Sequence, residues 1–233
     1  MADNAIRALV FWDIDLTLLD LRRIGASWFR AALAEVTGAQ DVEIPSFAGR
    51  TDRWITAEML RRIGRDATDA EIQRVQLAVL DIAAEHRAEI AEVGVELPGV
   101  SAALRAIADL PDVAQSLVTG NLAPIAEYKV AAFGLDAYLD LAVGGYGEVS
   151  EVRADLLGDA LAKATAKYGE FAPDSVFVIG DTPHDVDAAL AHKARAIAVA
   201  TGRYGEEELR EAGAHTVLPD LADTEAVLAL LRS

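Results

Sequence analysis

The second half of the chain alternates short apolar runs with longer segments whose apolar residues recur at helical spacing. The short runs predict strands at 113–118, 139–143, 175–179, 196–200 and 215–218. The longer segments predict helices at 100–110, 124–133, 153–168, 186–192 and 223–231. Repeated alternation of strand and helix predicts a parallel sheet with helices on both faces.

The first hundred residues follow a different pattern. An apolar run that ends at Trp12 predicts one strand buried on both faces. The segments after it predict helices at 23–37, 54–63 and 69–92, with no convincing strand among them. We therefore expect an α/β fold with a Rossmann-like parallel sheet core and an all-helical insertion after the first strand. The expected domains are a core at 1–20 and 96–233 and a helical domain at 21–95.

Two carboxylates follow the first strand. Asp13 and Asp15 come directly after the apolar run, with one residue between them. Aspartate is depleted in strands and is costly near a core unless it is paired or bound to a metal. Open α/β sheets bind their ligands at the carboxyl ends of their strands. We therefore expect Asp13 and Asp15 to lie in a ligand site at the end of a central strand.

Two later strands also end in polar residues. One leads into Thr119, Gly120 and Asn121, and the other leads into Asp181 and Asp185. Taken alone, each motif has a simpler interpretation. The Thr-Gly-Asn sequence is typical of a turn, and capping of the next helix accounts for one carboxylate of the last motif, although not for Asp185. Because the carboxyl ends of parallel strands share one edge, the three motifs are expected to converge on one crevice.

The carboxylates expected at this edge favour a divalent cation. Asp13, Asp15, Asp181 and Asp185 would repel one another strongly in one crevice unless something cationic lay among them. Hard divalent ions prefer oxygen ligands, so Mg²⁺ is the expected cofactor. The chain has no cysteine, which excludes disulfides and thiolate metal sites and makes zinc a poor candidate.

Composition narrows the class of partner. The chain has 233 residues, of which 52% are apolar, so one core domain with an insertion is expected. Its formal net charge of −17 argues against nucleic acid or an anionic membrane as the main partner. No apolar run has membrane-spanning length, and the start lacks a long apolar signal region. A soluble, cytoplasmic protein is expected, either monomer or homodimer.

The three motifs together resemble those of the haloacid dehalogenase superfamily. The resemblance rests on Asp-x-Asp-x-Thr-Leu after the first strand, Thr-Gly-Asn after a later strand, and Gly-Asp-x-x-x-Asp after a third. The first and last motifs are highly specific together, and their order fits over essentially the whole chain. A helical insertion after the first motif is similar to the cap of the phosphoglycolate phosphatase and β-phosphoglucomutase-like branch.

This resemblance implies a role for each motif residue. Asp13 is the nucleophile that forms an aspartyl phosphate, and Asp15 is the general acid and then the general base. Mg²⁺ is held by Asp13, by the backbone carbonyl of Asp15 and by Asp181, with Asp185 as a direct or water-mediated supporter. Thr119 donates its hydroxyl to phosphoryl oxygens.

The sequence departs from the family pattern at two positions. The family usually has a lysine between the second and last motifs, and Arg153 stands where that lysine is expected. A guanidinium can pair with both a phosphoryl oxygen and a carboxylate, so we assign the role to Arg153, against the alternative of an ordinary first-turn surface arginine. Leu16 occupies a position where the family often has glycine.

Substrate binding is expected to involve the second motif and the cap. Gly120 and Asn121 are expected beside the phosphoryl group, and Arg50 lies in a segment that resembles the family's specificity loop, where it either meets a substrate anion or is solvated. Trp28 and Trp54 either line the pocket or pack within the cap. No lysine precedes Tyr128, which excludes the Schiff-base chemistry of the phosphonoacetaldehyde-hydrolysing relatives.

Three functional hypotheses follow. The first is a Mg²⁺-dependent phosphatase that hydrolyses a small phosphorylated metabolite through a phospho-aspartate. The second is a phosphomutase of the β-phosphoglucomutase type, and the third is a catalytically silent protein that binds a phosphate ester. The intact set of motif residues favours an enzyme, and Asp15 favours phosphoryl chemistry, because displacing halide requires no acid.

Overall fold

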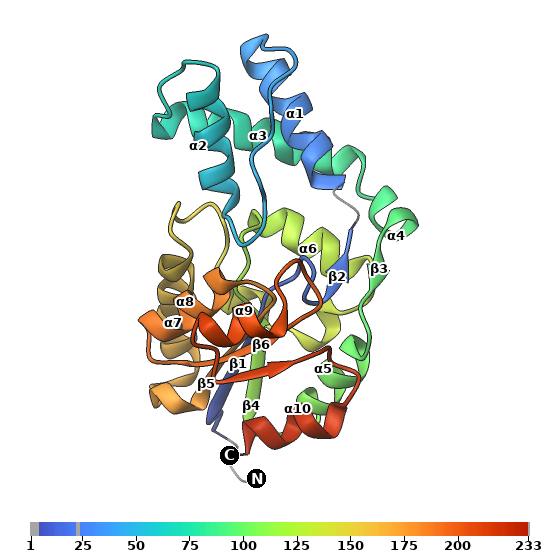
Figure 1. The fold of residues 1–233 in the computed structure, drawn as a ribbon, viewed down its shortest axis with the longest axis vertical. Helices are drawn as coiled ribbons and strands as arrows, with labels where there is room; N and C mark the ends of the chain where they lie inside the picture. The colour runs from blue at the N-terminus through green and yellow to red at the C-terminus, as the bar shows by residue number, and fades with distance from the viewer. Residues whose placement is uncertain (1–4, 22–23, 233) are drawn as a thin grey trace.

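The computed structural model describes residues 5–21 and 24–232, and its centre is a five-stranded parallel sheet in the order β4-β1-β5-β6-β7 (Figure 1). The strands are β1 (Ala8–Trp12), β4 (Val113–Leu117), β5 (Val176–Gly180), β6 (Arg195–Val199) and β7 (Thr216–Leu218). β1 pairs in parallel with β4 on one side and with β5 on the other. The three strands that precede the motifs are therefore neighbours, and their carboxyl ends lie at one edge.

Helices cover both faces of this sheet. Alternate residues of β1 face opposite sides, because side chains alternate along a strand. Val10 and Trp12 pack in the cluster that contains α5 (Val100–Ala108) and α10 (Thr224–Leu231). Leu9 and Phe11 pack in the cluster that contains α7 (Arg153–Tyr168) and α8 (Pro183–Ala191). Burial on both faces explains the continuous apolar run before Asp13 and confirms the predicted α/β fold.

The remaining helices lie mostly beyond the carboxyl edge of the sheet. A helical region, residues 24–93, contains α1 (Ile24–Thr37), α2 (Asp52–Arg62), α3 (Asp69–Glu85) and α4 (Glu89–Val93), and Figure 1 shows α1, α2 and α3 above the sheet. It is joined to the sheet region where β2 (Leu19–Asp20) pairs antiparallel with β3 (Val95–Glu96). α6 (Ala123–Ala131) lies beneath it and contacts α3.

The structure corrects several predicted elements. The strand predicted at 139–143 is wrong: the chain forms short 3₁₀ helices at Asp136–Tyr138 and Leu141–Val143. This segment meets the edge of β4 only at separate points, such as the bond from Asp140 N to Gln115 O, so no continuous ladder forms. The helix predicted at 69–92 ends at Glu85 and resumes as α4. At this break, the His86 ring nitrogen Nδ1 and the His86 backbone N–H both contact the carbonyl oxygen of Ile82.

The strands β2 and β3 and the helix α9 were not predicted. The β2–β3 pair is only two residues long in each strand, and α9 (Glu206–Glu211) is short and highly charged, so neither has a hydrophobic pattern that would reveal it. The start of the helix predicted at 23–37 falls on residue 23, which lies outside the described residues; the helix begins at Ile24 in the described part.

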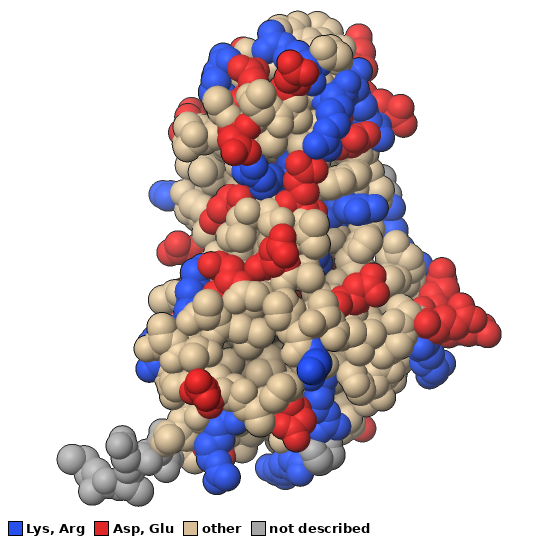
Figure 2. Space-filling view, turned by 90° about the vertical axis from the view of Figure 1, so that its left-hand side faces the viewer, with Lys and Arg blue, Asp and Glu red and all other residues tan. Residues whose placement is uncertain are grey.

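Charged residues are spread over the surface. On the face shown in Figure 2, acidic and basic side chains are interspersed over the helical region, and larger uncharged areas lie below it. No helix within residues 5–21 and 24–232 is long and apolar enough to cross a membrane.

Candidate active site

A cavity of about 880 cubic ångströms lies between the carboxyl edge of the sheet and the helical region. The sheet side contributes polar residues of all three motifs, among them Asp13, Asp15, Thr119 and Asp181. The opposite side contributes apolar and aromatic residues of the helical region, among them Ile24, Trp28, Phe29 and Phe47. The cavity therefore has a charged floor and a largely apolar roof.

Three buried aspartates form an acidic cluster on this floor. Asp13 follows β1, while Asp181 and Asp185 follow β5, and each of the three can place one carboxylate oxygen within 4.8 Å of the others. Burial raises the pKa of Asp13 to about 6, although Arg153 opposes the shift. Burial, together with repulsion from Asp13 and Asp185, raises the pKa of Asp181 to about 8. Ionising all three therefore calls for compensating positive charge.

The donor set of this cluster fits Mg²⁺. In the described part of the chain, the side-chain hydrogen bond seen for Asp181 is a long one, 3.5 Å from Thr17 Oγ1. A buried carboxylate with so little compensation is suited to a hard cation with oxygen ligands. Gly202 leaves room for the Asp181 carboxylate, because a methyl group at Gly202 would overlap one of its oxygens. Asp13 and Asp181 are thus the residues best placed to hold the ion.

Asp185 caps the start of α8, a role that was not expected from the sequence. Thr182 is the N-cap of α8, and Asp185 completes a capping box by accepting hydrogen bonds from Thr182 N (3.1 Å) and Thr182 Oγ1 (2.6 Å). The expectation that capping does not account for Asp185 is therefore wrong. Asp181, rather than Asp185, is the carboxylate that helix capping leaves unexplained.

Arg153 bridges the first and last motifs. It is the first residue of α7, it is 7% exposed, and its Nη2 lies 2.6 Å from Asp13 Oδ1 and 2.6 Å from Asp185 Oδ1. The same nitrogen donates to the carbonyl of Val118. Burial acts to lower the pKa of this guanidinium, but the carboxylates of Asp185 and Asp13 outweigh it and hold the pKa above its ordinary value. The alternative of a surface arginine is wrong.

Asp15 lies outside the acidic cluster. Its side chain is 47% exposed, and both carboxylate oxygens accept hydrogen bonds from Lys129 Nζ, at 2.8 and 2.7 Å. Asn121 Nδ2 donates to Asp15 Oδ2 at 2.8 Å. The Asp15 carboxylate is therefore held by Lys129 and Asn121. A ligand role for Asp15 through its backbone carbonyl stays a prediction.

The second motif organises both the floor and the contact with the helical region. Asn121 Nδ2 also donates to Thr119 Oγ1 at 2.8 Å, so the hydroxyl proton of Thr119 is free to donate elsewhere. Gly120 O accepts a hydrogen bond from Asp52 N (2.7 Å), and a methyl group at Gly120 would overlap the carbonyl oxygen of Arg50. Gly120 is thus required for close approach of the helical region to the motif.

Asp52 adds a buried carboxylate from the helical region. It is the first residue of α2, it is 4% exposed, and its Oδ2 accepts a hydrogen bond from Leu122 N at the start of α6. Burial raises the pKa of Asp52 to about 7, while the Leu122 N–H and the charge of Lys129 oppose the shift. The helical region is therefore held to the second motif by a buried hydrogen bond from Leu122 N to the Asp52 carboxyl group.

Leu16 has a backbone conformation that glycine adopts more readily than other residues. Its φ is +64°, in the left-handed region, where an L-residue is strained by about 1–2 kcal/mol. Its N–H donates to Leu19 O, and its carbonyl accepts from Thr201 Oγ1, which fixes the turn after Asp15.

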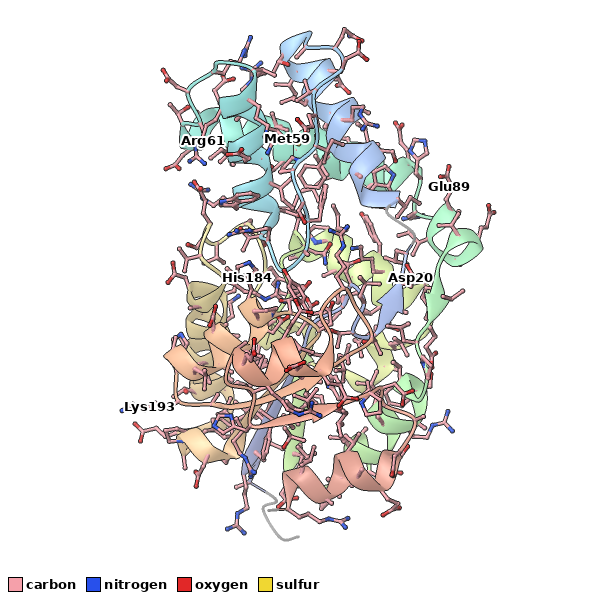
Figure 3. All side chains as sticks on the ribbon, in the orientation of Figure 1. Asp20, Met59, Arg61, Glu89, His184 and Lys193 are labelled. Atoms are coloured by element: carbon pink, nitrogen blue, oxygen red, sulfur yellow. The ribbon has the colours of Figure 1, made fainter. Side chains whose placement is uncertain are left out.

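Arg50 and Trp28 line the cavity. The Arg50 guanidinium lies 4.4 Å from the centre of the Trp54 ring, a cation–π contact that holds Arg50 at the cavity wall. Trp28 is almost fully buried in the main hydrophobic cluster. Figure 3 shows His184 where α8 meets the helical region, and a methyl group at Gly49 would overlap its ring.

Lys129 and Asp52 are the site residues that the sequence interpretation missed. Lys129 shares the buried face of α6 with Ile125, Ala126 and Val130, and a lysine on the apolar face of an amphipathic helix is a usable signal. Asp52 gave no such signal, because an acidic residue in the first turn of a helix is common on electrostatic grounds alone.

The fold and the site together define an α/β protein with an acidic centre at the carboxyl edge of a parallel sheet. Residues 154–224, which include Asp181 and Asp185, match the family model described as HAD-hydrolase-like. Among curated proteins, none matches the sequence. The match to residues 154–224 confirms the resemblance to the haloacid dehalogenase superfamily.

Solved structures of similar fold cover nearly the whole chain. CbbY from Rhodobacter sphaeroides, solved in complex with phosphate, is 20% identical with a TM-score of 0.72, and the match covers 96% of this chain and 100% of that one. A hydrolase from Pseudomonas syringae is 23% identical with a TM-score of 0.68, covering 96% and 98%. A haloacid dehalogenase-like family hydrolase from Streptococcus pneumoniae is 17% identical with a TM-score of 0.61, covering 96% and 97%. These likenesses establish a shared fold over both the sheet and the helical region.

Proposed function

We propose that this protein is a Mg²⁺-dependent phosphatase that hydrolyses a small phosphorylated metabolite through a phospho-aspartate on Asp13. The observation that carries the proposal is the division of two nearby carboxylates. Asp13 is buried beside Arg153 and Asp181, whereas Asp15 faces the cavity outside that cluster. A buried, cation-held carboxylate next to an accessible one is suited to nucleophilic catalysis with acid–base assistance.

In the first half of the reaction, Asp13 attacks phosphorus. Arg153 holds Asp13 Oδ1, which leaves the other carboxylate oxygen to form the new bond to phosphorus. The bond from phosphorus to the leaving oxygen breaks as Asp15 gives that oxygen a proton, which releases the alcohol. In the second half, a water oxygen attacks phosphorus while Asp15 takes the proton of that water. The bond between phosphorus and the Asp13 oxygen breaks, which releases inorganic phosphate and restores the Asp13 carboxylate.

The phosphoryl oxygens are bound by groups already in place. Thr119 accepts from Asn121, so its own proton is available to a phosphoryl oxygen. Arg153 Nε is buried and has no hydrogen-bond partner within the described residues. When bound, Mg²⁺ supplies charge stabilisation to the phosphoryl group, with Asp13 and Asp181 as its side-chain ligands. The phosphate in the complex of CbbY is consistent with an anion site in this fold.

Residues 21–95 act in this proposal as a cap over the core formed by 1–20 and 96–233. The apolar roof of the cavity and the contacts of Asp52 with Gly120 and Leu122 favour a closed site that excludes water from the reacting group. A small metabolite is favoured because the cavity measures about 880 cubic ångströms, within the range of ordinary ligand sites.

Phosphate release from p-nitrophenyl phosphate and from a panel of phosphorylated metabolites tests the proposal. Activity should require Mg²⁺, disappear on chelation and return when the ion is restored. Asp187→Asn is a matched control for the aspartate variants, because Asp187 is exposed on α8, two residues from Asp185.

Product analysis separates the alternatives. A sugar 1-phosphate that yields its isomeric phosphate instead of inorganic phosphate indicates a mutase. Tight binding of a phosphate ester by calorimetry without turnover indicates a silent binding protein, and either result overturns the phosphatase assignment.

A further inference from the structure

Lys129 is a buried lysine whose hydrogen bonds, among residues 5–21 and 24–232, go to residues of the first two motifs. Its side chain is 6% exposed, and its Nζ donates to Asp15 Oδ1 (2.8 Å), Asp15 Oδ2 (2.7 Å) and Asn121 Oδ1 (2.6 Å). Burying an ammonium group is costly unless it is paired and hydrogen-bonded. Here the three bonds compensate that cost, and two of them end on the carboxylate proposed to move the proton.

Asn121 closes this arrangement into a ring. It accepts from Lys129 and donates to Asp15 Oδ2 (2.8 Å), so each of the three side chains contacts the other two. Asn121 also donates to Thr119 Oγ1. The hydroxyl proposed to bind the phosphoryl group and the carboxylate proposed to protonate the leaving oxygen are therefore parts of one bonded network.

The position of Asp15 requires such a restraint. Asp15 is two residues from Asp13, and its side chain is 47% exposed at the cavity. A flexible Asp15 side chain has many orientations, most of which leave it out of reach of the leaving oxygen. Fixing a catalytic group in one productive orientation is worth orders of magnitude in rate.

We propose that Lys129 is the positioning residue for Asp15, which it holds with Asn121 on the cavity side of the acidic centre, directed at the leaving group of the substrate. This inference rests on the proposed phosphatase function. Lys129 itself contacts no reacting atom. Its effect is exerted through the orientation of Asp15, so it should matter most for substrates whose leaving oxygen needs a proton.

Leaving-group dependence separates positioning from simple structural support. The p-nitrophenolate leaving group is stable without a proton, whereas the phenolate of phenyl phosphate gains more from protonation. Loss of Asp15 positioning therefore reduces kcat/KM more for phenyl phosphate than for p-nitrophenyl phosphate. Loss of structural support alone reduces both by the same factor.

The experiment uses the full chain as wild type, Lys129→Met, Asp15→Asn and the double variant. Lys129→Met should lower kcat/KM for phenyl phosphate about 10-fold more than for p-nitrophenyl phosphate, a fraction of the full acid–base contribution of about 10²–10⁴. In the Asp15→Asn background, Lys129→Met should change either value less than about twofold, because residues acting as one unit are not additive. Mg²⁺ binding measured by calorimetry should be unchanged in Lys129→Met.

Lys167→Met is the control, since Lys167 pairs with Asp140 on the surface and is not part of the cavity wall. Lys129→Arg covers the case in which Lys129→Met does not fold. It keeps the charge with a different donor geometry, so it should show the same selectivity to a smaller degree, about threefold.

Equal losses on both substrates, or full additivity with Asp15→Asn, overturn the positioning role while leaving the phosphatase assignment intact. A wild-type protein that releases phosphate from neither substrate nor any metabolite of the panel overturns the phosphatase assignment, and the role of Lys129 falls with it.

Discussion

The two aspartates of the first motif lie two residues apart and are held in opposite ways. Asp13 is 5% exposed, contacts Arg153 and shares a cluster with Asp181 and Asp185. Asp15 has a half-exposed side chain and contacts Lys129 and Asn121. One carboxylate thus belongs to a buried centre of four charged groups, and the other belongs to a small polar ring that opens onto the cavity.

This difference supports the two tasks proposed for one residue type. Arg153 neutralises part of the charge around Asp13 but also occupies one of its oxygens, which leaves a single oxygen for chemistry. Lys129 occupies both oxygens of Asp15 from one side and leaves the carboxylate accessible from the other. Environment, rather than residue identity, separates the proposed nucleophile from the proposed proton carrier.

The largest effect is expected from replacing Asp13, the buried aspartate of the two. Asp13→Asn removes the nucleophile while keeping the size of the side chain. Phosphate release should fall at least about 1,000-fold, the scale seen when a covalent nucleophile is removed. Steady-state assays with p-nitrophenyl phosphate measure the loss, with Asp187→Asn as control. Activity within a factor of two of wild type would falsify the assignment of Asp13.

The next effect concerns the cation between Asp13 and Asp185. Arg153→Met leaves both carboxylates buried without their partner, which should cost about 3–5 kcal/mol of unfolding free energy. Denaturant titration measures it, and activity should fall with it. Arg153→Lys keeps a positive charge and should lose less stability. If Arg153→Met and Arg153→Lys are equally stable, the ion pairs contribute little to the fold.

Asp52 provides a test near the Asp15 side of the cavity, through the pH dependence of stability. Its pKa is raised to about 7 in the folded protein, chiefly by burial, against an ordinary value of 3.8. The folded state therefore binds this proton more tightly, and stability is lost as the pH rises through this window. The groups that act on Asp52 are Lys129 of α6, Asp15 after β1, Glu148 and the Leu122 N–H.

Asp52→Asn removes this titration and keeps an oxygen to accept from Leu122 N. The unfolding free energy of the variant relative to wild type should therefore rise between pH 5 and pH 8, by about 2–3 kcal/mol. Thermal melts at both pH values measure the change. A difference that is constant with pH means that Asp52 does not titrate in this window.

The smallest effect is expected at Leu16, which lies next to Asp15 in the left-handed region. Leu16→Gly removes the strain but adds entropy to the unfolded chain, so the net change should stay within about 1 kcal/mol. Leu16→Val should be the less stable of the two, because a β-branched residue is a genuine outlier at positive φ. Chemical denaturation of both variants provides the comparison, and a more stable Val variant contradicts the strain at this turn.

The sequence by itself determined the sheet and the convergence of the motifs. Apolar runs before Asp13, Thr119 and Asp181 specify buried parallel strands, and the geometry of such a sheet brings their carboxyl ends to one edge. It also identified Arg153 as a candidate, because that residue opens a helix at the position where the family places a cation. The sheet and the convergence of the motifs are consequences of local periodicity and order along the chain, whereas the choice of Arg153 came from the resemblance to the haloacid dehalogenase superfamily.

Only the tertiary structure decided which groups share a charge environment. The pairing of Lys129 with Asp15 joins residues 114 positions apart, and that of Asp52 with Leu122 joins residues 70 apart. Neither follows from periodicity, because each depends on how α6 and the helical region are oriented over the sheet. Electrostatic partners are set by distances of a few ångströms, so the different environments of Asp13 and Asp15 become visible only once the chain is folded.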